Sequence, residues 1–489
     1  MMTAILVLSL VAAGTSLVPR RRLIETVAVV VPLVQLALVV GLIGAVLAQG
    51  QVMELGGWLA ADGLSALIAL VTAGVGAAAA IHSIGYLRED LRGRDLDRGS
   101  GLRDVQRYYG LLHLFVFSML LVPLSNSLGV VWIAIEGTTL ASVFLVSYYR
   151  TREALEAAWK YVIIGSVGIA LALFGTILAY YAAVPVLGFS FDLNWSSLTA
   201  VAPRLDPDVM RLAFLFIVVG YGTKAGLAPM HTWLPDAHSE APSPISALLS
   251  GVLLNAALYA ILRFYTLTVP AVGVADVGAL LLGFGLLSLL VAALFMLRQN
   301  DYKRLLAYSS VEHMGVIVVA TAFGGPLGMT AALLQLVGHA LAKSLMFFAA
   351  GHVLLRYETK EIDQVSGVIR ALPASGAFLL LGGLALTGAP PFGLFVSELT
   401  ALTAGFSSGF GPAALIVLAC LVVIFIAFMG HLNRMVFGRL PADVARGERP
   451  RVGWIPLGAE GLLLLVLGLS IPGPFGDLVH AAVRALGAS

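Results

Sequence analysis

The feature that most constrains this chain is a succession of apolar segments, each long enough to cross a membrane as a helix. A helix of about 20 apolar residues spans the hydrocarbon layer with every backbone group bonded internally. Fourteen such segments predict an all-α, polytopic membrane protein. They cover residues 3–18, 24–48, 58–82, 108–126, 128–148, 157–183, 211–230, 244–268, 274–297, 304–323, 327–356, 372–405, 412–438 and 453–472.

The composition agrees with a membrane protein and excludes a soluble one. Hydrophobic residues make up 59% of the 489-residue chain and charged residues only 11%, whereas a soluble domain carries about 25% charge. The formal net charge of +2 leaves no strongly basic surface for nucleic acid. We therefore expect a lipid bilayer as the environment and no nucleic acid as a partner.

Known cofactor motifs are missing from the sequence. The single cysteine, Cys420, permits no disulfide within the chain and no cysteine-ligated iron–sulfur site. The sequence has no Walker motif, no GxGxxG after a strand, no HExxH and no CxxCH. We expect no cofactor, no metal and no catalytic residue in this chain, so the energy for any transport comes from an ion gradient or a partner.

Basic residues predict the orientation in the membrane. The loops after segments 1, 3, 5, 9, 11 and 13 hold 23 of the 29 Lys and Arg residues. Because such residues stay on the cytoplasmic side, both termini are expected outside the cytoplasm. The loop 85–106 and the stretch 439–451 are then the largest cytoplasmic surfaces.

Two blocks of five segments, 108–268 and 274–438, have nearly equal length. Each carries an ionisable residue in its second segment and a Gly/Pro-broken fourth segment with a charge. An odd number of segments inverts the second copy in the membrane. We expect two inverted five-helix half-channels, preceded by a three-helix region at 1–107 and followed by a loop and one helix at 439–489.

Ionisable residues at membrane depth are the strongest functional signal. Each costs at least about 2.5 kcal/mol there, so such residues line a pathway more often than they serve only as structural bonds. Glu136 and Lys224 lie too deep to reach a surface, and His231 and His238 flank the predicted cytoplasmic end of segment 7. The expected proton-carrying residues are Glu136, Lys224, His231, His238, Glu312, His313, His339, Lys343 and Glu398.

Prolines are expected to break two of these helices. Pro229 interrupts segment 7, and Pro390 and Pro391 interrupt segment 12. A proline cannot donate to the carbonyl four residues before it, so acceptors are freed at membrane depth. Discontinuous helices beside charged residues are typical of ion sites.

Four long motifs carry a resemblance. They are KAGLAPMHTWLPDAHSEAPSPISALLSG from Lys224, DYKRLLAYSSVEHMG from Asp301, HALAKSLMFFAAG from His339 and TGAPPFGLFVSE from Thr387. With them the chain resembles the antiporter-like membrane subunits of respiratory complex I and Mrp antiporters. Within that family, DYKRLLAYSSVEHMG, GAPPFGLFVSE and HLNRMVFG look closest to component F of hydrogenase-4.

The resemblance implies a fourteen-helix subunit of a prokaryotic inner-membrane complex. Its implied partners are other antiporter-like subunits and a peripheral electron-transfer module with iron–sulfur and [NiFe]-hydrogenase subunits. It pairs Glu136 with Lys224 and makes Glu398 the exit residue. Asn255 stands where the family usually has a lysine, and asparagine cannot titrate.

Three functions stay open from the sequence. In the first, protons enter near His231 and His238, load Lys224 and leave through Glu398, driven by a redox partner. In the second, the chain is a component of a cation/proton antiporter or of an ion-driven inorganic-carbon uptake system. In the third, it is a membrane scaffold with a degenerate channel, for which Asn255 is the best argument.

Overall fold

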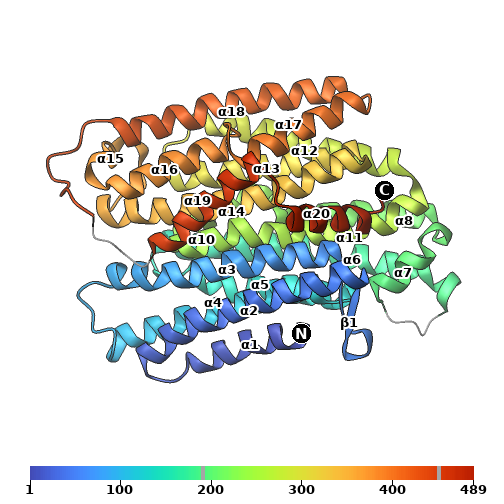
Figure 1. The fold of residues 1–489 in the computed structure, drawn as a ribbon, viewed down its shortest axis with the longest axis horizontal. Coiled ribbons are helices and arrows are strands. Elements are labelled where there is room, and N and C mark those ends of the chain that lie inside the picture. The colour runs from blue at the N-terminus through green and yellow to red at the C-terminus, as the bar shows by residue number, and fades with distance from the viewer. Residues whose placement is uncertain (189–192, 449–452, 489) are drawn as a thin grey trace.

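The structure, a computed structural model, describes residues 1–188, 193–448 and 453–488. It is almost entirely helical, and most helices run roughly parallel to one another (Figure 1). The longer helices are α1 (Met2–Thr15), α2 (Arg21–Gln49), α3 (Gly63–Asp90), α4 (Gly99–Leu124), α5 (Leu128–Val146), α6 (Arg152–Leu187), α8 (Pro207–Ala225), α11 (Leu254–Val272), α12 (Val274–Met296), α13 (Tyr302–Phe323), α14 (Gly325–Tyr357), α16 (Pro373–Leu386), α17 (Gly393–Ser407), α18 (Gly411–Phe437), α19 (Trp454–Leu469) and α20 (Gly473–Ala485).

Shorter elements connect these helices. They are the paired strands β1 (Val52–Glu54) and β2 (Leu59–Ala61), the helices α7 (Trp195–Val201), α9 (Trp233–Glu240), α10 (Ser243–Leu248) and α15 (Val368–Ala371), the π-helix η4 (Leu249–Leu253), and the 3₁₀ turns η1 (Leu55–Gly57), η2 (Ala202–Arg204), η3 (Met230–Thr232) and η5 (Ile362–Gln364).

The predicted all-α membrane fold is confirmed. Within the described residues, eleven helices are long and apolar enough to cross a membrane, or twelve if α19 and α20 form one bent span. Each of the fourteen predicted segments contains a helix, but α1 and α16, with 14 residues each, fall short of a full span. Fourteen spans therefore remain a prediction.

The two predicted breaks lie where the prolines require them. Helix α8 ends at Ala225 and α16 at Leu386, each four residues before a proline of the break. These are the residues whose carbonyls lose their helical donor at Pro229 and Pro390. Left-handed glycines turn the chain just beyond, Gly226 at φ 75° and Gly388 at φ 64°.

Inner and outer helices differ in burial. In the most apolar 18-residue stretches of α10–α11 and of α13 every residue is buried, and in that of α14 94% of the residues are. In the corresponding stretches of α2, α6, α12 and α18 at most 39% of the residues are buried. The position of α18 along one edge of the bundle in Figure 1 agrees with this difference. The polar residues of α11, α13 and α14 therefore lie inside the protein, away from lipid.

The end of the chain adds a helix that was not predicted. Helix α20 bends 76° from α19 and packs on the start of α3. A side chain at Gly63 would lie 2.4 Å from the Ala481 backbone, so only glycine permits this approach. Of the predicted cytoplasmic stretch 439–451, residues 449–451 lie outside the described part of the chain.

Candidate functional site

Lys224 lies at the end of α8, completely buried, two residues before the left-handed Gly226 that ends the helix. Its ammonium donates to the Thr139 hydroxyl on α5 at 2.5 Å and to the Tyr161 hydroxyl on α6 at 3.2 Å. Thr139 in turn donates to a Glu136 carboxylate oxygen at 3.2 Å. Thus Glu136 and Lys224, which the resemblance pairs, are linked through the Thr139 hydroxyl.

Glycines on α6 let α8 approach closely enough for these contacts. A side chain at Gly165 would lie 3.3 Å from the Lys224 ammonium, and one at Gly168 would lie 2.5 Å from Thr223. The Trp233 indole after the break donates to the Thr223 carbonyl at 2.8 Å. The break therefore adds a side-chain donor to a helix-end carbonyl that also accepts from the Gly226 N–H at 3.4 Å.

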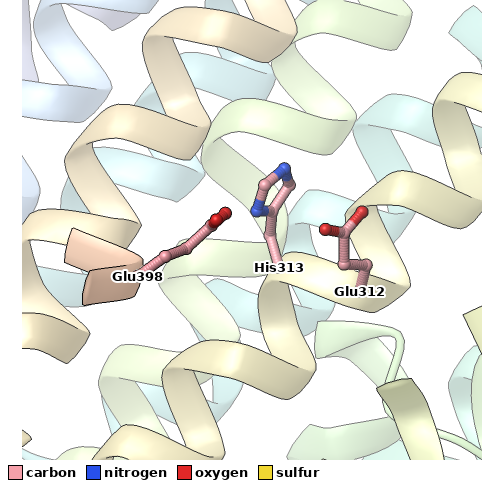
Figure 2. Close-up of side chains that lie close together, drawn as sticks. All are labelled: Glu312, His313 and Glu398. Atoms are coloured by element: carbon pink, nitrogen blue, oxygen red, sulfur yellow. The ribbon is translucent and has the colours of Figure 1, made fainter. Parts of the chain in front are cut away.

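A second cluster unites three predicted residues from two helices. Glu312 and His313 on α13 and Glu398 on α17 are buried, and one oxygen or nitrogen atom of each lies within 4.8 Å of the others. Figure 2 shows the His313 ring between the two carboxyl groups. A side chain at Gly388 would lie 2.0 Å from Glu398 Oε2, so the carboxyl packs directly on the backbone of the second break.

Helix α14 presents Gln335, His339 and Lys343 at intervals of four residues on one face. The Lys343 ammonium donates to the Leu306 carbonyl at 2.6 Å and to the Ser309 hydroxyl, both on α13. The face therefore runs along α13, which carries Glu312 and His313.

Three further contacts tie this face to the second cluster. The rings of His339 and His313 lie 5.2 Å apart. Gln335 Nε2 lies 2.8 Å from His313 Nδ1, and the Gln335 carbonyl accepts from Ser397, the neighbour of Glu398. The two helices and α17 thus share one polar network in the buried centre of the protein.

Asn255 is buried and is the second residue of α11, which continues the π-helix. Its amide donates to the Gly251 carbonyl at 2.7 Å and to the Leu336 carbonyl of α14 at 3.4 Å. Its Oδ1 is buried and has no partner among the described residues. Asn255 therefore offers an open acceptor beside the turn of α14 that holds His339.

His231 and His238 are buried instead of lying at an open mouth. The His238 ring stacks on Phe347 of α14 at 5.4 Å between ring centres. The His231 ring packs against Tyr308 of α13 at 6.0 Å. The ring contacts of both histidines thus lead to α13 and α14, not to Lys224.

A buried lysine that its sequence position does not reveal lies close to His238. Lys303 is one of the basic residues expected on the cytoplasmic side, but its side chain is buried and donates to the carbonyls of Ser239 and Ala241 at 3.0 and 2.6 Å. Nearby, Asp236 pairs with Lys160 at 2.9 Å and with Arg304. These three charged residues line a surface pocket of about 250 Å³, together with Glu153, Glu156 and Glu240.

Residues 125–426, which include both clusters, match the family described as NADH:quinone oxidoreductase/Mrp antiporter, transmembrane. The chain belongs to this family. The match confirms the predicted resemblance to the antiporter-like membrane subunits and covers every predicted ionisable residue.

Relatives and solved structures agree with this assignment. The chain is 41% identical over 422 residues to the hydrogenase-4 component F homolog of Methylacidiphilum infernorum, covering 85% of this chain and 86% of the relative. A chain of the archaeal membrane-bound sulfane sulfur reductase has 25% identity and a TM-score of 0.85, covering 99% of this chain and 98% of the other. A chain of respiratory complex I from Thermus thermophilus has 26% identity and a TM-score of 0.76, over 96% and 97%.

Proposed function

We propose that this antiporter-like subunit translocates protons across the membrane within a multisubunit redox complex. The observation that carries this proposal is a pair of ionisable clusters at two broken helices, the buried Lys224 with the partly buried Glu136, and the buried Glu398 with Glu312. Buried ionisable groups of this density at helix breaks are typical of ion pathways.

The first half of the path is the Glu136–Thr139–Lys224 chain. A nearby carboxylate stabilises the ammonium form of a lysine, and separating the two releases the proton. Thr139 is well placed for this change, because a hydroxyl both donates and accepts. A shift of α5 against α8 then alters the proton affinity of Lys224.

The second half consists of His339, Lys343, His313, Glu312 and Glu398. Protons enter from the cytoplasm by way of His231 and His238, whose contacts with α13 and α14 add an input to this half. Asn255 cannot carry a proton, but its open Oδ1 can hold a water that does. Glu398, at the second break, releases protons outside.

Architecture and partners follow from this path. Residues 108–268 and 274–438 form two inverted half-channels, flanked by the regions 1–107 and 439–489. The subunit lies in a prokaryotic inner membrane, with both termini on the side away from the cytoplasm. The partners are other antiporter-like subunits and a peripheral module with iron–sulfur and [NiFe]-hydrogenase subunits, as the name of the Methylacidiphilum relative suggests.

A component of a cation/proton antiporter is the second candidate. It is favoured by Glu312 and Glu398, whose carboxylates converge with His313 in the buried centre. Carboxylate oxygens suit hard cations such as sodium. In this version a cation and protons compete for the same cluster.

Purification of the intact assembly separates the two candidates. A tagged chain is extracted in mild detergent, its partners and metals are identified by mass spectrometry, and the complex is reconstituted in liposomes. We expect nickel, iron and iron–sulfur subunits, with proton transport that follows electron transfer and needs no sodium. Membrane partners alone, with sodium-dependent exchange, would overturn the redox proposal in favour of the antiporter.

A further inference from the structure

A buried carboxyl group lies outside the path described above. Glu460 on α19 is 3% exposed, and its Oε1 lies 2.6 Å from the Ser344 hydroxyl of α14. Its other oxygen, Oε2, has no partner among the described residues. Ser344 directly follows Lys343, so Glu460 lies near the depth of the second cluster but on another face of α14.

The surroundings of Ser344 accommodate Glu460 with or without a proton. The hydroxyl has one hydrogen, yet it lies 2.6 Å from Glu460, 2.9 Å from the Ala340 carbonyl and 3.1 Å from the Leu341 carbonyl. When Glu460 is ionised, Ser344 donates to it. When Glu460 is protonated, its O–H donates to Ser344, which turns to a carbonyl.

A row of aromatic and imidazole rings leads from Ser344 along α14 toward the predicted cytoplasmic side. Phe348 and His352 follow Ser344 at intervals of four residues. His82 of α3 stacks on Phe348 at 4.3 Å between ring centres, and its ring lies 5.1 Å from that of His352. Two titratable rings therefore lie in contact on the face that carries Ser344.

The outer end of this row reaches the surface. His352 Nδ1 lies 2.7 Å from the Ser375 hydroxyl, which donates to Glu448. His352 and Glu448 line a small surface pocket together with Glu89 and Arg356. Water and protons at this surface thus have access to His352, beside two carboxylates that attract protons.

The inner end points at Glu460. His82 Nδ1 lies 3.1 Å from the carbonyl of Gly453, at the foot of α19. Glu460 follows seven residues later, a rise of about 10 Å. Helical side chains lean toward the N-terminus of their helix, so the carboxyl leans toward His82. A proton relay over the distance that remains needs bridging water.

We propose that Glu460 is a second proton-loading site, supplied from the Glu89–Glu448 pocket through His352 and His82. A proton from pocket water binds a ring nitrogen of His352, passes to His82 and ends as the O–H of Glu460, while the water's hydroxide is neutralised in the cytoplasm. No electrons move. This inference rests on the proposed function, because a proton stored beside Lys343 matters only in a proton-translocating subunit.

Infrared difference spectroscopy of the purified intact complex, recorded across a pH change, tests this site without requiring transport. Glu460→Gln is expected to remove one carboxylic-acid C=O band from the spectrum. The control Glu358→Gln changes an exposed glutamate on the predicted cytoplasmic side and is expected to keep that band. Glu460→Asp keeps the acid and shifts the band, so it tests the same group if the Gln variant does not assemble. An unchanged spectrum in the Glu460 variants would overturn the proposal.

The supply route has its own kinetic test. After a pH jump, the double variant His82→Phe, His352→Phe is expected to keep the Glu460 band but to delay its rise at least tenfold. An unchanged rate would overturn the route. Failure here is distinguishable from failure of the proposed function, since Lys224 variants test transport and leave the Glu460 band in place.

Discussion

The Thr139 hydroxyl lies 2.5 Å from the Lys224 ammonium and, on its other side, 3.2 Å from a Glu136 carboxylate oxygen. A single side chain thus connects the acid Glu136 and the base Lys224. Neither charged group needs to move far for this link to break, because rotation of the Thr139 hydroxyl is enough to break its hydrogen bond to Glu136.

Thr139→Val is expected to slow proton translocation about tenfold, because a lost hydrogen bond to a charged group is worth about 1.5 kcal/mol or more. The measurement is the initial rate of acidification in liposomes at equal complex content. Thr138→Val is the matched control, since Thr138 is buried on the next position of α5 and donates only to the Ile135 carbonyl in its described contacts. Equal rates in both variants would exclude the hydroxyl link.

Gly388→Ala is expected to displace Glu398 and reduce translocation strongly. The new side chain would lie 2.0 Å from Glu398 Oε2, and it would also adopt a left-handed conformation, which costs about 1 kcal/mol. Gly409→Ala carries the same backbone cost at φ 84° but has nothing within 4 Å. If both variants lose transport equally, backbone strain and not the position of Glu398 is responsible.

Asn255→Leu tests whether the path crosses the centre of the molecule. Leucine has a similar volume but removes the open Oδ1 acceptor, so we expect translocation to fall at least about tenfold while the complex still assembles. Asn255→Lys supplies a titratable group and is expected to retain transport. Full activity of the leucine variant would show that protons bypass Asn255.

Asp62→Asn is expected to lower stability without affecting the path. Both Asp62 oxygens accept from the buried Arg263 guanidinium, at 2.5 and 2.7 Å, and removing one charge of a buried pair costs about 3–5 kcal/mol. Thermal unfolding of the purified complex measures the loss. Asp276→Asn breaks an exposed pair with Arg211 and should leave the midpoint nearly unchanged. An equal midpoint for both variants would contradict the structural role of Asp62.

Local chemistry made the breaks predictable. Pro229 and Pro390 each remove a backbone donor, and the helices end at the residues four positions earlier. The positions of the membrane-spanning segments were predictable from hydropathy, which is also a local property of the sequence. The π-helix at 249–253 escaped prediction because nothing in that stretch forbids an ordinary helix.

Contacts between distant helices were not predictable. Glu460 follows Trp454 in an ordinary apolar segment, and only the packing of α19 on α14 brings it to Ser344. His82 and His352 are 270 positions apart, so no spacing rule connects them. By its sequence Lys303 belongs to a basic loop, and its burial was not predictable because its hydrogen bonds go to the distant carbonyls of Ser239, near the end of α9, and of Ala241, just after it.

The most direct test of the central claim is the number of protons translocated per electron by the reconstituted complex carrying Lys224→Met. Methionine keeps an unbranched stem in the narrow space beside Gly165 but cannot hold a proton. We predict normal assembly and translocation near the background level. A wild-type proton-to-electron ratio in this variant would contradict the claim that Lys224 carries protons.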